Sequence, residues 1–379
     1  MNFDVVIVRY SGEIGIKGKQ TRKWMEKILT DNIRIKLEKE ELDVKEIIRK
    51  YGRIYIYGKN PKAISKTVSN VFGVVSTSPA IIVDSDVDEI CKTSRKVAEE
   101  ILDAGDSFRI TTRRVGTHPF TSEDISIKAG AAVLDQMSGK GVSVNLNTPD
   151  KQIFIEIRHE MAYLFHEVIS AVGGMPTGTQ GKIAIIISCD ELGWIAAFLI
   201  MKRGCEPVPI IFNIHNSLNS SNLPEKIPYL SALKTFIPSE FSVFLVPFTA
   251  ILEELKQLIP KESLYLFCRK LQLQIAEHLC KQFDMKGIVT GDLLDCPEKS
   301  KIYNLVDTSV KLPIYRPLIS LDAEKLTKYK NLLGISGNVS CPSLCKDTTI
   351  SLAKINQTRK ITFEKRVNSI IEEMDIIHI

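Results

Sequence analysis

The sequence lacks the features that mark secreted and membrane proteins. Its 379 residues include only 8 cysteines, which is too few for a disulfide framework and points to a reducing compartment. No apolar run approaches the roughly 20 residues that a membrane helix needs. The opening segment MNFDVVIVRY has no basic leader and carries Asp4 inside its apolar stretch, so it predicts a strand and not a signal peptide. We therefore expect a cytoplasmic protein without a membrane partner.

A strong excess of one charge is also missing. The formal net charge is only +5, with 50 lysines and arginines against 45 acidic residues. This excludes a bulk polycation, so a nucleic-acid surface would have to come from local basic clusters. The share of hydrophobic residues, 44%, is typical of globular proteins, and the length is sufficient for two or three domains. Composition does not decide whether the chain forms a homodimer.

Residues 1–59 show strand, helix and strand patterns in turn. Residues 5–8 form a short apolar run, and GEIGIKGKQ follows as a glycine-rich loop. From Thr21 to Leu37 apolar residues recur every four positions, which predicts a helix with one buried stripe, and RIYIY at 53–57 alternates like a strand. These patterns predict a small α+β domain. Basic residues on the other faces of the helix are interpreted as solvated surface: Arg22, Lys23, Lys27, Arg34 and Lys36.

Residues 60–168 predict a second domain around one basic strand end. FRITTRR alternates like a strand and ends on Arg113 and Arg114. A helix that carries Lys128 is predicted to begin near Ser122, and its amino end could bind a phosphate directly. A polar loop with surface charge explains the same residues. Two alternating strands within IFIEIRHEMAYLFHEVI, residues 153–169, close this domain, and HEMA is the predicted turn between them.

Residues 173–182, GGMPTGTQGK, are rich in glycine and proline and predict a linker, which we set at residues 169–181. It resembles a Walker phosphate loop, but the residue five before Gly181 is Pro176 and a strand pattern follows Lys182. Both features contradict that motif. The segment is therefore interpreted as a hinge.

Strand and helix patterns alternate over residues 182–349. The apolar stretches IAIIIS, PVPIIF, SVFLVPF and KGIVTG are separated by helical segments, which predicts an α/β fold with a doubly wound parallel sheet. Ligands of such sheets bind beyond the carboxyl ends of the strands, where this chain places SCDELG, FNIHN and TGDLLDC. Residues 350–379 predict a basic, then helical tail without an assigned role.

Several segments resemble, in order, those of the tRNA 4-thiouridine synthetase (tRNA sulfurtransferase) family. RYSGEIGIKGKQTRKWMEKILTDNI looks like its opening, FRITTRR with PFTSEDISIKAGAAVLD is similar to its THUMP domain, and IVTGDLL and IYRPLISLDAEKL match its PP-loop ATP-pyrophosphatase domain. The resemblance implies a ferredoxin-like domain, a tRNA-binding THUMP domain and a PP-loop domain. On this chain these fall on residues 1–59, 60–168 and 182–349, with a C-terminal tail over 350–379.

The resemblance also implies a reaction and its partners. ATP adenylates a uridine oxygen of a tRNA, and a cysteine persulfide then displaces AMP. The expected partners are the acceptor end of a tRNA and a protein that donates persulfide sulfur. The expected tRNA contacts are Arg109, Arg113, Arg114 and Lys128.

The family's phosphate loop, SGGxDS, falls on residues 188–193 and retains only Ser188. The Cys189 side chain would crowd the backbone N–H groups that approach a phosphate. Asp190 and Glu191 place negative charges beside a triphosphate, each costing on the order of 4 kcal/mol at about 4 Å and an effective dielectric near 20. A bound magnesium ion would reverse that sign. Acidic residues also stabilise a helix start, the interpretation we favour, so ATP and magnesium are expected cofactors only if the loop works.

Other positions of the family's nucleotide site fall on residues that would contact ATP mostly through backbone or apolar atoms. One of them, on a later helix, is basic. The expected ATP-binding residues are Ile186, Ile187, Ser188, Ile211, Phe212, Arg269, Gly291 and Ser300.

Sulfur transfer needs a cysteine that carries persulfide, and often a second that resolves it. CPSLC places Cys341 and Cys345 four positions apart, near the family's cysteines, and on a helix they would share one face. A zinc site would need two further ligands, which no neighbouring motif supplies, so no metal site is predicted. Buried structural cysteines are the competing interpretation. Three functions therefore stay open: a tRNA-thiolating enzyme, a tRNA-binding protein whose PP-loop domain is not catalytic, and an ATP pyrophosphatase that acts on another substrate.

Overall fold

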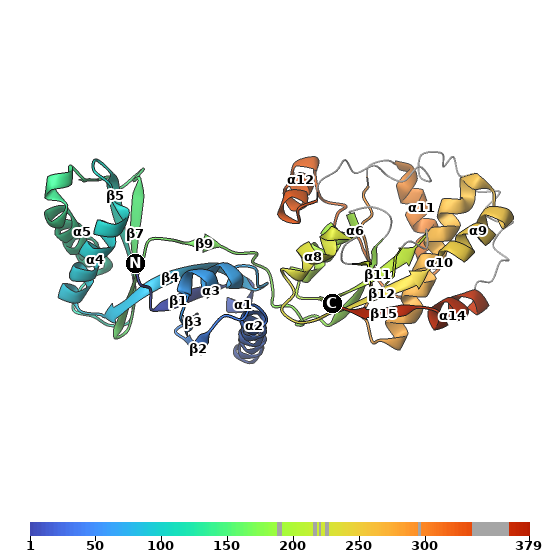
Figure 1. Ribbon diagram of the computed structural model, residues 1–379, viewed down its shortest axis with the longest axis horizontal. Coiled ribbons are helices and arrows are strands. Elements are labelled where there is room, and N and C mark those ends of the chain that lie inside the picture. Colours follow the sequence, from blue (N-terminus) through green and yellow to red (C-terminus); the bar gives the residue numbers. More distant parts are fainter. Residues whose placement is uncertain (188–191, 215–217, 220, 224–226, 295–296, 336–363) are drawn as a thin grey trace. The chain divides into compact units, whose positions relative to one another are not determined.

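The computed structural model describes residues 1–187, 192–214, 218–219, 221–223, 227–294, 297–335 and 364–379 (Figure 1). The chain divides into two compact units, Met1–Gly174 and Met175–Ile379. Within the described part of the chain, none of the helices has both the length and the apolar character that a membrane span requires.

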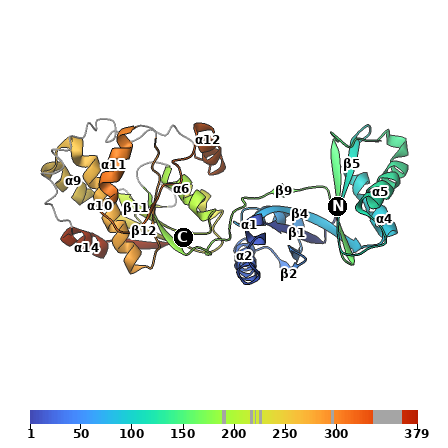
Figure 2. The same ribbon diagram turned by 180° about the vertical axis from the view of Figure 1, so that it is seen from behind.

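The N-terminal unit is built on one nine-stranded sheet with the order β2-β3-β1-β4-β8-β7-β5-β6, and β9 pairs with β4. Figure 2 shows α4 and α5 side by side against the strands at one end of this sheet. The elements are β1 (Val5–Tyr10), α1 (Gly12–Gly15), α2 (Lys19–Lys39), β2 (Val44–Lys50), β3 (Arg53–Gly58), α3 (Pro61–Val68), β4 (Val74–Asp84), α4 (Val87–Ile101), β5 (Ser107–Val115), α5 (Ser122–Gln136), the 3-10 turn η1 (Ser138–Lys140), β6 (Ser143–Val144), β7 (Lys151–Arg158), β8 (Met161–Phe165) and β9 (Ile169–Ser170).

Helix α2 shows why the first part of the sequence folds as it does. Its stripe from Met25 to Leu37 is buried, as the four-residue period predicts. Most of its basic residues are exposed or half-buried. Lys36 differs from the expected solvated position: it is buried and its Nζ lies 2.9 Å from Glu40 Oε1. An i,i+4 carboxylate compensates its charge there.

The long strand β4 joins the two halves of the N-terminal unit. Its first part, Val74–Ala80, pairs with β1, and its second part, from Ile81 to Asp84, pairs with β8. Helix α3, which we expected to open the second domain, packs on β1 and β4. A shared core lies across the joint, where the rings of Tyr55 and Tyr163 stack with centroids 4.8 Å apart. The two halves are thus continuous through one strand and one core.

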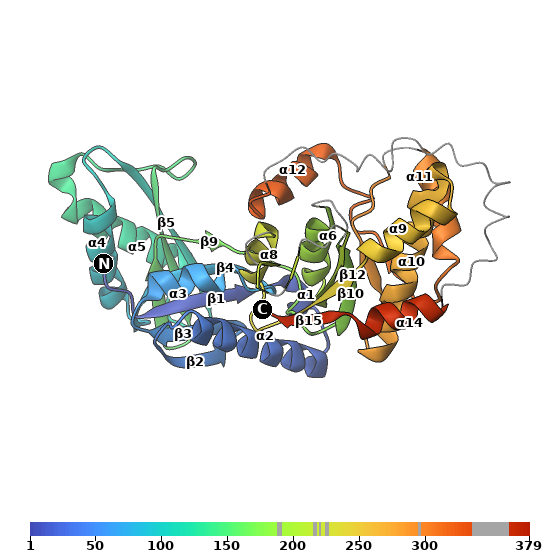
Figure 3. The same ribbon diagram turned by 45° about the vertical axis from the view of Figure 1, so that its right-hand side comes forward.

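The C-terminal unit confirms the predicted doubly wound parallel sheet. Its strand order is β14-β13-β10-β11-β12-β15, and every pair is parallel except β12 with β15. Helices α9, α10 and α14 cover one face, while α6 packs on the other (Figure 3). The elements are β10 (Lys182–Ile187), α6 (Leu192–Met201), β11 (Glu206–Asn213), α8 (Pro228–Lys234), β12 (Ser242–Pro247), α9 (Thr249–Leu258), α10 (Lys261–Gln282), β13 (Ile288–Thr290), α11 (Pro297–Asp307), β14 (Ile314–Tyr315), α12 (Ala323–Leu332), α14 (Glu364–Glu372) and β15 (Asp375–His378).

The end of the chain belongs to this unit, although the sequence assigned it no role. Strand β15 pairs with Ser242–Leu245 of β12. Ile379 and Phe241 exchange two backbone hydrogen bonds of 3.0 and 3.2 Å, and Val367 and Ile370 of α14 are part of the core. The last strand therefore covers the edge of β12, which would otherwise present unpaired backbone groups.

The strand order defines where a ligand of this unit would bind. The chain leaves β10 toward β11 on one side and returns as β13 on the other. The carboxyl ends of β10 and β13 consequently meet at a topological switch point, which is where open α/β sheets bind ligands.

Candidate functional site

Two glycines allow the backbones at the switch point to touch. A Cβ added to Gly291 would lie 2.6 Å from the backbone nitrogen of Gly193 and 2.7 Å from the carbonyl carbon of Leu192. Only glycine permits this approach, which presses the start of α6 against the end of β13. Ser188 and the other loop residues up to 191 lie outside the residues that the structure describes.

The predicted apolar contacts with a nucleotide are deeply buried. Ile186 and Phe212 are 1% and 5% exposed and belong to the core beneath α10. Ile187 and Ile211, each 4% exposed, alternate with them along β10 and β11 and therefore face the side of α6. A ligand at this edge would meet mainly the backbone of these strands.

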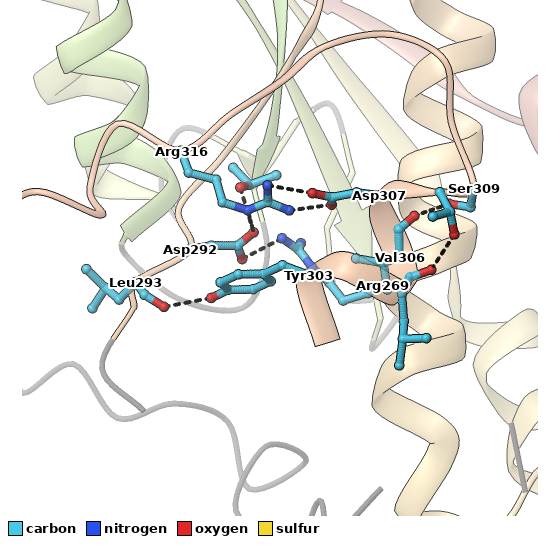
Figure 4. A network of polar contacts seen from close by, with 11 residues as sticks. Arg269, Asp292, Leu293, Tyr303, Val306, Asp307, Ser309 and Arg316 are labelled. Carbon is cyan, nitrogen blue, oxygen red and sulfur yellow. Dashed lines mark hydrogen bonds and ion pairs between the residues drawn. The ribbon is translucent and has the colours of Figure 1, made fainter. Parts of the chain in front are cut away.

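A buried carboxylate, Asp292, organises the side chains beyond the end of β13 (Figure 4). Its Oδ1 accepts a 2.6 Å hydrogen bond from Arg269 Nη2, and its Oδ2 accepts bonds of 3.1 Å from Arg316 Nε and 2.7 Å from Thr290 Oγ1. Arg316 also donates two bonds, of 2.6 and 2.9 Å, to Asp307. We call these five side chains the Asp292 network.

Burial alone would raise the pKa of Asp292, but Arg269, Thr290 and Arg316 together hold that pKa below its ordinary value. Burial would likewise lower the pKa of Arg316, yet Asp307 and Asp292 raise it. Asp292 is therefore ionised, and its ion pairs to Arg269 and Arg316, with that of Arg316 to Asp307, pair two arginines with two carboxylates. The network is neutral as a whole and contributes no surplus positive charge toward a triphosphate.

The two remaining residues that the sequence predicted to contact a nucleotide, Arg269 and Ser300, differ in burial and lie on different helices. Arg269 on α10 is 7% exposed and its guanidinium is held by Asp292 and, at 3.4 Å, by Gln272. Ser300 lies on α11 and is exposed. Sequence reasoning missed Arg316 and Asp307 as partners of Asp292. The available signal was an arginine directly after the apolar pair of β14, in IYRPL.

The expected tRNA contacts do not converge on one point. Arg109 and Arg113 point to one face of β5 and Arg114 to the other, because side chains alternate along a strand. Arg109 donates hydrogen bonds to Thr111 Oγ1 and to the Leu146 carbonyl, each 3.0 Å. Arg114 donates to the Gly116 carbonyl at 3.1 Å. Exposed Arg113 lines a cleft of about 340 Å³, and Lys128 is exposed on α5.

The amino end of α5, suggested by the sequence as a direct phosphate site, already has protein partners. Thr121 accepts a hydrogen bond from the Asp124 backbone N–H, and Asp124 in turn accepts from the Thr121 backbone N–H. This capping box satisfies two backbone N–H groups at the start of the helix. The hydrogen bonds from Thr121 also lower the pKa of Asp124, so a negative charge lies at the start of this helix and disfavours a second anion there.

A second buried carboxylate, Glu156, lies at the joint between the two halves of the N-terminal unit. It is 4% exposed and receives Arg9 from β1, Arg53 from β3 and Arg158 from its own strand, with N–O distances of 3.0, 3.0 and 2.5 Å. Burial would raise the pKa of Glu156, but the three arginines lower it. We call this group the Glu156 cluster; three cations around one anion leave two positive charges. Arg113 lines the same cleft as Arg9 and Glu156.

The predicted sulfur carriers Cys341 and Cys345 lie outside the residues that the structure describes. Among the described cysteines, burial raises the pKa of Cys91 and Cys205 and raises that of Cys280 to about 12. A raised pKa disfavours the reactive thiolate, so these three thiols are unsuited to carry persulfide.

Comparison with known proteins places all three parts of the chain in one family. Residues 5–78 match the ThiI ferredoxin-like domain, residues 84–167 the THUMP domain and residues 178–364 the thiamine biosynthesis protein (ThiI). A probable tRNA sulfurtransferase of Thermococcus kodakarensis is 34% identical over 88% of this chain and 88% of its own length. Another, from Saccharolobus solfataricus, is 30% identical over 99% of this chain and its own full length.

Solved structures agree with this placement. A crystal structure of a Pyrococcus horikoshii protein is 34% identical and covers 87% of this chain and 99% of its own, with a TM-score of 0.68. A 4-thiouridine synthetase, crystallised with RNA and bound ATP, covers both chains completely with a TM-score of 0.82 at 23% identity. The latter likeness supports the order and fold of the domains.

Proposed function

Given that this chain belongs to the tRNA sulfurtransferase family, we propose that it binds the acceptor end of a tRNA through its N-terminal unit. The observation that carries this proposal is the Glu156 cluster together with Arg113. Four arginines and one carboxylate leave three positive charges in this group, and Arg9, Arg113 and Glu156 line one cleft. Duplex RNA is recognised largely through its shape and phosphates, which such a surface suits.

The proposed reaction is the one that the family resemblance implies. A uridine oxygen of the tRNA attacks the α-phosphorus of ATP, and pyrophosphate leaves. A persulfide on Cys341 or Cys345 then attacks the activated ring carbon, and AMP leaves. The thiol of the other cysteine attacks the sulfur of the first, which releases the thiolated uridine and leaves a disulfide between Cys341 and Cys345 that a thiol reductant then reduces. The nucleotide would lie at the switch point between β10 and β13, with a magnesium ion, and a partner protein would supply the sulfur.

A specific observation favours a second candidate, a tRNA-binding protein whose C-terminal unit is not catalytic. The phosphate loop reads SCDELG where the family has SGGxDS. In addition, the two arginines nearest the end of β13 are balanced by Asp292 and Asp307. Neither feature attracts a triphosphate. Under this candidate function the chain binds RNA but catalyses neither adenylation nor sulfur transfer.

Calorimetry with ATP, with and without magnesium, separates the two candidates. The second predicts that the wild-type chain binds ATP weakly and releases no pyrophosphate. Replacing the loop carboxylates by Asp190→Gly and Glu191→Ile should then improve affinity, because two charges that repel a triphosphate disappear. If Asp190 and Glu191 instead bind magnesium, the wild type binds ATP tightly and Asp190→Gly loses binding. Thiolation of a tRNA transcript by the wild-type chain would establish the enzymatic candidate.

The cysteines provide an independent test of the chemistry. If Cys341 and Cys345 transfer sulfur, each single serine variant should lose thiolation while retaining its tRNA affinity. An exposed thiol with a lowered pKa would also alkylate faster than the other cysteines. Equal, slow alkylation of all 8 cysteines would contradict a role in transfer.

A further inference from the structure

A basic pocket in the ferredoxin-like half has no role in the function proposed so far. The start of α2 and the β2–β3 hairpin together enclose a cavity of about 410 Å³, which we call the hairpin pocket. One of its lining residues is acidic and seven are basic. The lining residues include Lys17, Lys19, Lys23, Arg49, Arg22 and Glu26.

The hairpin side of the pocket is fixed by a tight turn. Lys50 pairs with Arg53 across a two-residue turn in which Tyr51 and Gly52 have φ of +53° and +71°. Positive φ at both central residues matches the twist of a hairpin, but it is uncommon for a bulky residue such as tyrosine. Tyr51 is held there by His159, whose ring lies 4.0 Å away, and by Lys50, whose Nζ lies over its ring. The basic residues of the hairpin therefore keep a defined position.

The single carboxylate of the pocket already has partners. Glu26 Oε1 accepts hydrogen bonds of 2.7 Å from the Tyr10 hydroxyl and 2.8 Å from Arg22 Nε. Arg22 also donates a 2.9 Å bond to the Tyr10 hydroxyl. Burial and Glu26 raise the pKa of Tyr10, so this hydroxyl stays protonated. Glu26 and Arg22 thus neutralise each other and balance none of the other cations.

The remaining cations are not compensated by the protein. Four of them form no ion pair with any residue that the structure describes: Lys17, Lys19, Lys23 and Arg49. Gathering like charges costs folding free energy, and a bound polyanion removes that cost. Lysine ammonium and arginine guanidinium groups both bind phosphate well. The amino end of α2 adds to the field, because Gly18 supplies no side-chain cap and the first turn holds no acidic residue.

We propose that the hairpin pocket binds a phosphate group of the RNA, as a second anchor besides the Glu156 cluster. This inference rests on the proposed RNA binding and adds a site to it. Arg53 connects the two anchors, because it lines the pocket and also pairs with Glu156. The phosphate has two sources, the 5′ end of the RNA and its internal backbone, and both present the same chemistry to the pocket.

The test compares two double variants of the full chain that remove the same charge. Lys19→Ala with Arg49→Ala takes one cation from each wall of the pocket. Lys27→Ala with Lys45→Ala is the matched control, since it takes one exposed lysine from α2 and one from β2 outside the pocket. Affinity for a tRNA transcript is measured between about 50 and 200 mM salt. Thermal unfolding checks that both variants fold like the wild type.

We expect the pocket variant to bind at least about tenfold more weakly at low salt, while the control changes less than about twofold. The slope of log affinity against log salt should fall by about 1 in the pocket variant, because about 0.9 is lost with each phosphate contact. If the wild-type chain binds RNA and the two variants show the same affinity and the same salt slope, the pocket does not bind a phosphate. The proposed RNA binding would then still stand. If the wild-type chain binds no RNA, both proposals are wrong.

A second arm identifies the phosphate. The same transcript is prepared with a 5′-monophosphate and with a 5′-hydroxyl. If the terminal group occupies the pocket, the wild type and the control prefer the phosphorylated RNA and the pocket variant does not discriminate. If an internal phosphate occupies it, no protein discriminates, yet the pocket variant still binds both RNAs more weakly than the control.

Discussion

Each unit of this protein buries one carboxylate among arginines, and the two clusters differ in their charge balance. Glu156 holds three arginines and leaves two positive charges. Asp292 holds two arginines, and Asp307 completes a neutral set. The same chemistry therefore leaves a net positive cluster in the N-terminal unit and a neutral network in the C-terminal unit.

The difference in net charge between the two clusters determines which of them can attract a polyanion such as RNA or ATP. Surplus charge at a cleft acts on a polyanion over roughly a Debye length, about 8 Å at physiological salt. A balanced, buried network exerts little field at that range, and its arginines are already committed to hydrogen bonds. The Asp292 network is consequently expected to position the end of β13, whereas the Glu156 cluster is expected to position the RNA-binding halves and to attract the ligand.

The largest expected effect comes from breaking the Asp292 network. Asp292→Ala leaves Arg269 and Arg316 buried without their shared partner, which should destabilise the C-terminal unit by about 3–5 kcal/mol. Urea unfolding followed by the fluorescence of Trp194, which is buried in α6, measures this in a Trp24→Phe background. Asp307→Ala is the control. It should lower the free energy of unfolding by less than half as much, because Arg316 retains its ion pair with Asp292. A loss below about 1 kcal/mol for Asp292→Ala would show that the network is not structural.

Breaking the Glu156 cluster should have a smaller effect. Glu156→Gln keeps the shape of the side chain and some hydrogen bonds, so we expect a loss of about 2–3 kcal/mol in the N-terminal unit. Hydrogen exchange of the β7 amides reports this loss locally. At temperatures where the variant is folded, tRNA affinity should not fall, because the change adds one unit of positive charge. If Glu156→Gln instead binds tRNA more weakly than the wild type by the same factor at every salt concentration, Glu156 itself orders the RNA contacts.

Acid should weaken both units in the same direction. The pKa values of Glu156 and Asp292 are lowered in the folded chain. Their stabilising contribution is therefore fully present above the ordinary pKa values of about 4 and is lost as pH falls through the lower folded values. Urea unfolding followed between about pH 7 and pH 3 should show this loss below about pH 4. Asp292→Asn should flatten that dependence for the C-terminal unit, and an unchanged profile would contradict this assignment.

The smallest expected effect separates two neighbouring arginines. Arg113→Ala should weaken tRNA binding a few-fold and lower the salt slope by about 1, because its exposed side chain lines the cationic cleft. Arg114→Ala should leave the slope unchanged, because Arg114 points to the other face and bonds the Gly116 carbonyl. Filter binding at several salt concentrations measures both. Equal slopes for the two variants would contradict the difference between the faces of β5.

The sequence on its own determined the elements whose signal is local. The period of α2 and the alternation of strands and helices after residue 182 depend on neighbouring residues, and both appear in the part of the chain that the structure describes. The expected nucleotide positions, which stay predictions, could likewise be named along the chain from the motifs that resemble the family. Their surroundings could not, because SCDELG does not reveal that Gly291 packs against Gly193.

Only the tertiary structure decided which charges meet. Arg9 and Glu156 are 147 positions apart in the chain, and the walls of the hairpin pocket come from α2 and from the β2–β3 hairpin. Strand β15 likewise pairs with a strand more than 130 positions earlier. Such pairings leave no periodic pattern in a sequence, because a charged residue looks the same whether its partner is solvent, a phosphate or a distant carboxylate. The fold brings these residues together, and burial then determines which of their charges the protein must balance by itself.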